Sequence, residues 1–139
     1  MPDVWHESVA ETAETIYGGR MTTPDQQLDF LASLQANWDG EDALVIDPAI
    51  IAAARSFLKR LPDDLVSEPL TIPCPAGTLQ FEWESESCYL ELEFETPTMI
   101  HYLKQSGCLD EEDVFSVQDF DRAVSLIRWF EAGKLKEMQ

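Results

Sequence analysis

Apolar and polar residues alternate through the segment 78–95, and this pattern constrains the fold more than any other feature of the chain. Its apolar residues recur at every second position on both sides of a short polar interruption; they are Leu79, Phe81, Trp83, Leu90, Leu92 and Phe94. A period of two is typical of β-strands with one buried face, and the interruption Ser-Glu-Ser indicates a turn. The sequence therefore predicts an antiparallel hairpin with one apolar face and one wet face.

The parity of this hairpin also predicts its register. A two-residue turn at 86–87 pairs Phe81 with Leu92 on the apolar face. The same register places Glu82 directly opposite Glu91 on the other face. Like charges in directly opposed positions destabilise a sheet, so folding alone does not explain this pair.

The predicted wet face carries carboxylates and no basic residue. Its acidic residues are Glu82, Glu84, Glu91, Glu93 and Glu95. Carboxylates at every second position of a strand are about 6.7 Å apart, since the rise is about 3.3 Å per residue. Phosphates along one nucleic-acid strand have a comparable separation, with an axial rise of about 3.4 Å per nucleotide. We therefore hypothesise that this surface imitates a nucleic-acid backbone.

The net charge supports a basic partner. The chain has 27 acidic and 9 basic residues, which gives a net charge of −18 in 139 residues. A small domain needs a net charge of only about 2–8 for solubility. Such a field repels nucleic acid and anionic membranes and attracts basic protein surfaces. The predicted partner-binding set therefore also includes acids outside the hairpin, namely Glu41, Asp42, Asp110, Glu111, Glu112 and Asp113.

Helices are predicted on both sides of the hairpin. Residues 3–17 form one apolar stripe that includes Trp5. Thr23, Pro24 and Gln26 predict a capping box at the start of a second helix, and Asp47-Pro48 predicts the start of a third. A last helix is expected after a cap at Ser116.

The expected fold class is α+β, with an antiparallel sheet of three to four strands and helices packed on one face. Besides the hairpin, residues 70–73 predict an edge strand and residues 98–104 a fourth strand, whereas 107–113 are expected to be a loop. Residues 1–22 are predicted to be an N-terminal helix or arm, and residues 23–139 a single α+β domain. Trp38, in the turn Asn-Trp-Asp-Gly, is expected to anchor that turn in the core.

Three segments in this order resemble a family of small bacterial proteins of unassigned function: NWDGEDA (37–43), DPAIIAAARSFLKRLP (47–62), and LTIPCPAGTLQFEWE with YLELEFE (70–95). That family has an NWDG motif followed by an LEW-type strand, and the most specific matches here are Asn37-Trp38-Asp39-Gly40 and Glu82-Trp83. This chain differs where Glu41-Asp42 replace an aromatic-glycine pair. The resemblance implies a shared fold and no catalytic residues.

Motifs for catalysis, cofactors and metals are lacking in the sequence. It contains no CxxC, HExxH, calcium loop or glycine-rich phosphate loop, so no cofactor and no metal site are predicted. A nucleophile would need an imidazole base, and Cys88 with His101 on a neighbouring strand is the one conceivable pair. Cys88 shares the parity of Leu90, which favours a small core residue over a nucleophile.

Three cysteines without a close pair, no apolar run of about 20 residues and no basic-apolar leader predict a cytoplasmic protein of a bacterial host. We expect a non-enzymatic acidic inhibitor that binds a basic, nucleic-acid-binding protein or complex, as phage anti-defence and anti-CRISPR proteins or DNA mimics do. An antitoxin or immunity protein that neutralises a toxin is the alternative. A structural homo-oligomer, with a dimer formed through Leu126 and Trp129, is another.

Overall fold

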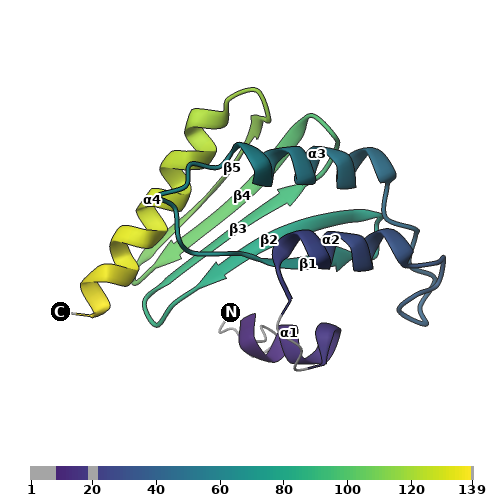
Figure 1. Ribbon diagram of the computed structural model, residues 1–139. Helices are drawn as coiled ribbons and strands as arrows, with labels where there is room; N and C mark the ends of the chain where they lie inside the picture. The colour runs from purple at the N-terminus through teal and green to yellow at the C-terminus, as the bar shows by residue number, and fades with distance from the viewer. Residues whose placement is uncertain (1–8, 19–21, 139) are drawn as a thin grey trace.

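The protein is an α+β fold in which one antiparallel sheet has helices on one face (Figure 1). The computed structural model describes residues 9–18 and 22–138. The strands are β1 (Leu70–Cys74), β2 (Thr78–Glu84), β3 (Cys88–Phe94), β4 (Met99–Ser106) and β5 (Leu109–Ser116), and each pairs with the next in the chain. The helices are α1 (Val9–Tyr17), α2 (Pro24–Ser33), α3 (Pro48–Arg60) and α4 (Phe120–Glu137).

The expected α+β class with an antiparallel sheet is confirmed, but the sheet has five strands and not three to four. The acidic residues 110–113, predicted as a loop, lie in β5 and pair with β4. Gly107, at a φ of +58°, allows the tight turn that leads from β4 to β5. β5 is an edge strand, and residues 109–114 are exposed on both of its faces. Only Phe115, near its end, is buried, so β5 shows no apolar alternation from which the sequence could predict it.

The predicted hairpin register is confirmed. Phe81 pairs with Leu92, and Glu82 pairs with Glu91. The apolar face of the hairpin is fully covered, since Phe81 and Leu92 are both 0% exposed. Phe57 of α3 packs onto this face, with its ring centroid 6.0 Å from that of Phe81.

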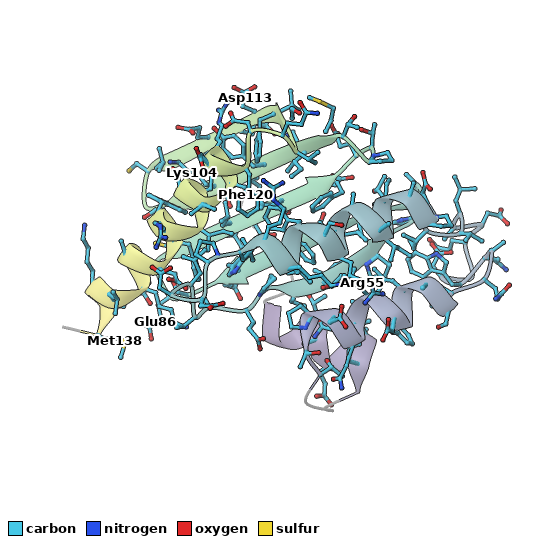
Figure 2. All side chains as sticks on the ribbon, turned by 45° about the horizontal axis from the view of Figure 1, so that its top comes forward. Arg55, Glu86, Lys104, Asp113, Phe120 and Met138 are labelled. Carbon is cyan, nitrogen blue, oxygen red and sulfur yellow. The ribbon has the colours of Figure 1, made fainter. Side chains whose placement is uncertain are left out.

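Local caps begin α2 and α3, and ion pairs join the two helices. The Thr23–Gln26 capping box forms as predicted, and Asp47 Oδ1 accepts a hydrogen bond from Ala49 N. Arg55 of α3, labelled in Figure 2, faces α2. It donates to Asp25 at 2.5 Å and to Asp29 at 2.8 Å. The helices therefore cover the sheet as a pair.

The Asn-Trp-Asp-Gly turn forms, although Trp38 is only partly buried where it packs against the core. Its indole N–H donates to Leu44 O at 2.9 Å. Asp39 Oδ1 accepts from Glu41 N and Ala43 N at 2.8 and 3.0 Å. The turn is thus held by its polar atoms as much as by its tryptophan.

α1 lies along the β1 edge of the sheet, next to α2 (Figure 1). The Tyr17 hydroxyl donates to Thr71 O at 2.5 Å. The Tyr17 and Phe30 rings pack edge to face, with their centroids 5.6 Å apart. Trp5, predicted to share the stripe of this helix, lies outside the described residues. No helix in the described ranges is long and apolar enough to span a membrane.

α4 begins later than the sequence predicts. Ser116 was expected to be the N-cap, but it ends β5, where it pairs with Met99, and the N-cap is Asp119. Pairing within the sheet keeps Ser116 extended, so the helix starts three residues later than predicted. Leu126, expected in a dimer interface, is 6% exposed and belongs to the core cluster, while Trp129 is partly buried over Lys104. The homodimer itself remains a prediction.

Gly133 in α4 marks a close approach of the helix to β3. A methyl group at this position would overlap Cys88 Sγ, which is buried in the core. Glycine costs about 1 kcal/mol relative to alanine inside a helix, so a glycine here indicates that packing outweighs helix propensity.

We expect Gly133→Ala to lower the free energy of unfolding by about 1–3 kcal/mol, because overpacking of the core outweighs the gain in helix propensity. Cys88→Ala removes the overlapping sulfur, so the double variant should be more stable than Gly133→Ala alone. Urea denaturation of the wild type, the two single variants and the double variant measures this coupling. Additive effects would contradict the close approach.

Candidate functional site

The sheet face turned away from α2, α3 and α4, termed here the open face, carries six carboxylates. Those strand residues are Glu82, Glu84, Glu91, Glu93, Asp110 and Glu112. Among the strand positions of this face none is Lys or Arg, and His101 is the only residue with a basic side chain. Glu95 follows β3 directly and is also exposed. The carboxylates of this face therefore come from β2, β3 and β5, and β4 between them contributes His101.

These carboxylates differ in exposure. Glu84, Asp110 and Glu112 are exposed, and Glu91 and Glu93 are half-buried. Glu82, predicted to be wet, is only 6% exposed, and Gln80 donates a hydrogen bond to it. Strand alternation correctly predicts the face on which Glu82 lies. The exposure of Glu82 depends on tertiary packing at β1 and β2, where α1 also packs.

Tyr89 is buried on the same face and donates to Glu91 Oε1 at 2.8 Å. Burial raises the pKa of Tyr89, and the carboxylates of Glu82 and Glu91 raise it further. The phenol therefore stays protonated at neutral pH and acts as a donor. It fixes the orientation of the Glu91 carboxylate.

The acidic run 110–113 is divided between the two faces of β5. Glu111 and Asp113 point to the helical side, where Tyr102 Oη donates to Glu111 at 2.5 Å and Arg122 lies 3.5 Å from Asp113. Asp110 and Glu112 remain on the open face. The structure therefore does not bring the run together as one patch.

Glu41 and Asp42 lie in the loop between α2 and α3, outside the sheet. Asp42 has a φ of +67°, and its N–H donates to Asn37 Oδ1 at 2.8 Å. These two acids shape and solvate a turn and are not part of the open face.

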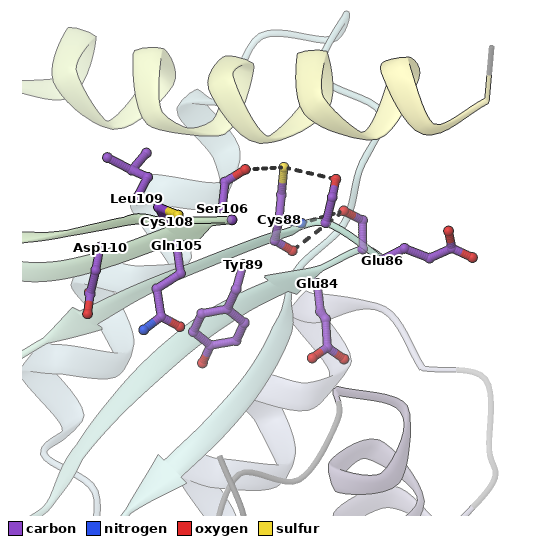
Figure 3. A pocket seen from close by; sticks show the side chains of 12 residues that line it. Glu84, Glu86, Cys88, Tyr89, Gln105, Ser106, Cys108, Leu109 and Asp110 are labelled. Atoms are coloured by element: carbon purple, nitrogen blue, oxygen red, sulfur yellow. Dashed lines mark hydrogen bonds between the residues drawn. The ribbon is translucent and has the colours of Figure 1, made fainter. Parts of the chain in front are cut away.

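A shallow hollow of about 440 Å³ lies at the end of the sheet where β2 turns into β3 and β4 turns into β5 (Figure 3). Glu84, Tyr89 and Asp110 point away from α4 in this view, whereas Cys88 points towards it. Cys88 therefore lies on the helical side of the sheet, while His101 is on the open face opposite Glu93. The conceivable Cys88–His101 pair does not form.

The turn beside this hollow is held by Glu137, near the end of α4. Its Oε2 accepts hydrogen bonds from Ser85 Oγ at 2.6 Å, from Ser87 N at 3.0 Å and from Ser87 Oγ, and its Oε1 accepts from Glu86 N at 3.1 Å. Hydrogen bonds from Ser85 and Ser87 lower the pKa of Glu137 from 4.5 to about 2. The ionised carboxylate therefore fixes the turn between β2 and β3.

Because the pKa of Glu137 is lowered on folding, its stabilisation is complete above pH 4.5 and is lost as the pH falls towards 2. We expect Glu137→Gln to lower the melting temperature at neutral pH. The difference from the wild type should shrink below pH 4.5 and disappear near pH 2. Thermal unfolding followed by circular dichroism across this range measures both effects.

Glu86→Gln is the matched control, because it removes one charge from the same turn without removing an acceptor of these hydrogen bonds. It should leave the melting temperature nearly unchanged. A difference between Glu137→Gln and the wild type that stays constant down to pH 2 would contradict the role of the carboxylate.

Glu91, Glu93 and His101 converge at the centre of the open face. One potential ligand atom from each lies within 4.8 Å of the other two. Thr78 Oγ1 donates to Glu93 Oε2 at 3.0 Å, and His101 Nε2 lies 2.9 Å from Glu112 Oε2. No metal site was predicted from the sequence, because short-range motifs do not reveal a cluster assembled from two strands. The cluster depends on the β3–β4 register, which places His101 opposite Glu93.

Cys74 lies near this cluster but remains a thiol. Burial raises its pKa to about 12, and the negative charges of Glu93, Glu91 and Glu82 add to the effect. The chemistry that the cluster offers at neutral pH is therefore that of oxygen and nitrogen donors.

In comparisons with known proteins, no family model, no curated protein and no solved structure matches this chain. The resemblance to the NWDG family therefore remains a prediction. The geometry and charge of the open face carry the functional argument.

Proposed function

We propose that this protein is a non-enzymatic inhibitor that binds a basic, nucleic-acid-binding protein or complex through its open face. The observation that carries the proposal is a sheet face with six strand carboxylates and no Lys or Arg at its strand positions. The face would occupy a groove that otherwise holds the phosphates of DNA or RNA.

The placement of the basic residues supports this surface. Arg55 pairs with Asp25 and Asp29 between α2 and α3, and Arg128 of α4 pairs with Asp64 at 2.7 Å. Lys104, although it is on β4, points to the helical side and lies 4.9 Å from the Trp129 ring centroid. These three positive charges are engaged away from the open face, and a field from its carboxylates would steer a basic partner towards it.

The carboxylates are also preorganised. Glu91 and Glu93 are on the central strand of the sheet, and a hydrogen bond fixes one oxygen of each. Side chains that are already ordered lose less entropy on binding than a disordered acidic tail would. Glu84, Glu91, Glu93, Asp110 and Glu112, with Glu95 beside them, form the proposed contact set. Glu82 is too buried for direct contact and adds to the field alone.

Removal of exposed charges from the open face tests this proposal. We expect Glu84→Gln/Glu95→Gln/Asp110→Asn to weaken binding by about tenfold at low salt, mainly through a slower association rate. The full chain serves as bait in a nuclease-treated cell lysate at low and high salt. The captured partner is then measured with each variant by surface plasmon resonance, with a DNA duplex as competitor.

The matched control is Glu41→Gln/Asp63→Asn/Asp121→Asn, which removes three exposed charges outside the open face. Both variants have a net charge of −15, since three charges are removed from −18. The control should bind as the wild type does. Equal losses in both variants, or a partner that binds duplex and inhibitor simultaneously, would sink the proposal. The identity of the partner separates an anti-defence inhibitor from an antitoxin.

A further inference from the structure

We propose that Glu91, Glu93 and His101 form a binding site for a divalent transition-metal ion, with Zn²⁺ the best-matched ion. This site goes beyond the proposed function and does not depend on it. Three features support it: the convergence of the three side chains, the neighbours that orient them and the mixed chemistry of their donor atoms.

The backbone brings the three side chains together. Glu91 and Glu93 are two residues apart on β3 and therefore share a face, and His101 on β4 is directly opposite Glu93. Their ligand atoms lie within 4.8 Å of one another. A tetrahedral Zn²⁺ with bonds of about 2.0 Å spaces its ligands about 3.3 Å apart. Small side-chain rotations would therefore close the cluster around an ion without moving the strands.

Each of the three side chains has a neighbour of its own that orients it. Tyr89 Oη donates to one oxygen of Glu91, and Thr78 Oγ1 donates to one oxygen of Glu93. His101 Nε2 lies 2.9 Å from Glu112, and an N–H that donates there leaves the lone pair of Nδ1 for the ion. Carboxylate–histidine pairs and hydrogen-bonded carboxylates of this kind surround metal sites in proteins, where they fix the ligand orientation.

The donor set selects the class of ion. Two carboxylates and one imidazole suit Zn²⁺ and its neighbours in the first transition row. Ca²⁺ needs six to eight oxygen ligands, and Mg²⁺ retains most of its water. The His101 side chain is 26% exposed, so a fourth position on the ion would face solvent and hold water.

A dication at this place would also relieve repulsion. Glu82, nearly buried, is directly opposite Glu91, and Glu112 is beside His101. The double positive charge of the ion would attract these carboxylates and offset their mutual repulsion. The effect is stronger because the carboxylates are partly shielded from water. The opposed Glu82–Glu91 pair, which folding alone does not explain, would gain a physical reason.

Metal titration of the full chain tests the site. After treatment with a chelator, isothermal titration with ZnCl₂ should show one equivalent bound per chain. Both His101→Ala and Glu93→Gln should weaken that binding at least tenfold. His6→Ala and Cys108→Ser serve as controls, because they remove the other histidine and an exposed cysteine, and they should bind as the wild type does.

A second measurement needs no variant that alters the site. Zn²⁺ should shift the ring resonances of His101 in the nuclear magnetic resonance spectrum of the wild type, and MgCl₂ and CaCl₂ should not. The variant Glu84→Gln/Glu95→Gln/Asp110→Asn should bind Zn²⁺ as the wild type does, which separates this site from the partner-binding proposal.

Three outcomes would overturn the proposal. The first is the absence of a bound equivalent of Zn²⁺. The second is binding that persists in His101→Ala, and the third is equal binding of Mg²⁺ and Ca²⁺ with no shift of the His101 ring. The last outcome would mean that the face attracts cations only as a diffuse counterion layer.

Discussion

Burial of the apolar side of the β2–β3 hairpin determines what the other side of the sheet presents. Because successive strand residues point to opposite faces, covering Phe81 and Leu92 with α3 and α4 forces Glu82 to oppose Glu91 on the open face. A shift by one residue would expose the aromatic core and bury a row of carboxylates. The hydrophobic effect on one face therefore holds a repulsive arrangement on the other.

Carboxylates that the fold holds close together favour the binding of cationic groups. The electrostatic repulsion between neighbouring carboxylates falls when cationic groups bind beside them. A basic groove and a metal ion are two ways to reduce this repulsion, and both proposals use Glu91 and Glu93. The exposed outer acids, such as Glu84 and Asp110, would contact the groove alone, whereas the half-buried Glu91 and Glu93 are shared with the ion. The two proposed sites therefore overlap at the centre of the open face.

Local patterns sufficed to predict much of the fold. The register of Phe81 with Leu92, the Thr23 capping box and the Asp47 cap all depend on residues close in sequence. Features decided by distant contacts were missed. β5 shows no apolar alternation, since Phe115 is its one buried residue, and Ser116 is a possible helix cap that pairs in the sheet instead. The burial of Glu82 depends on tertiary packing, and the approach of His101 to Glu93 depends on the β3–β4 register, which no alternation in β3 alone determines.

The hydrogen bonds from the β2–β3 turn to Glu137 have a consequence for the order of folding. They join positions 50 to 52 residues apart, whereas the hairpin itself closes over a few residues. Hairpin contacts cost little loop entropy and form early, but the turn acquires its carboxylate acceptor only once α4 has docked across β3. We therefore expect the tip of the hairpin to become ordered last, although it belongs to the part of the sheet that pairs first.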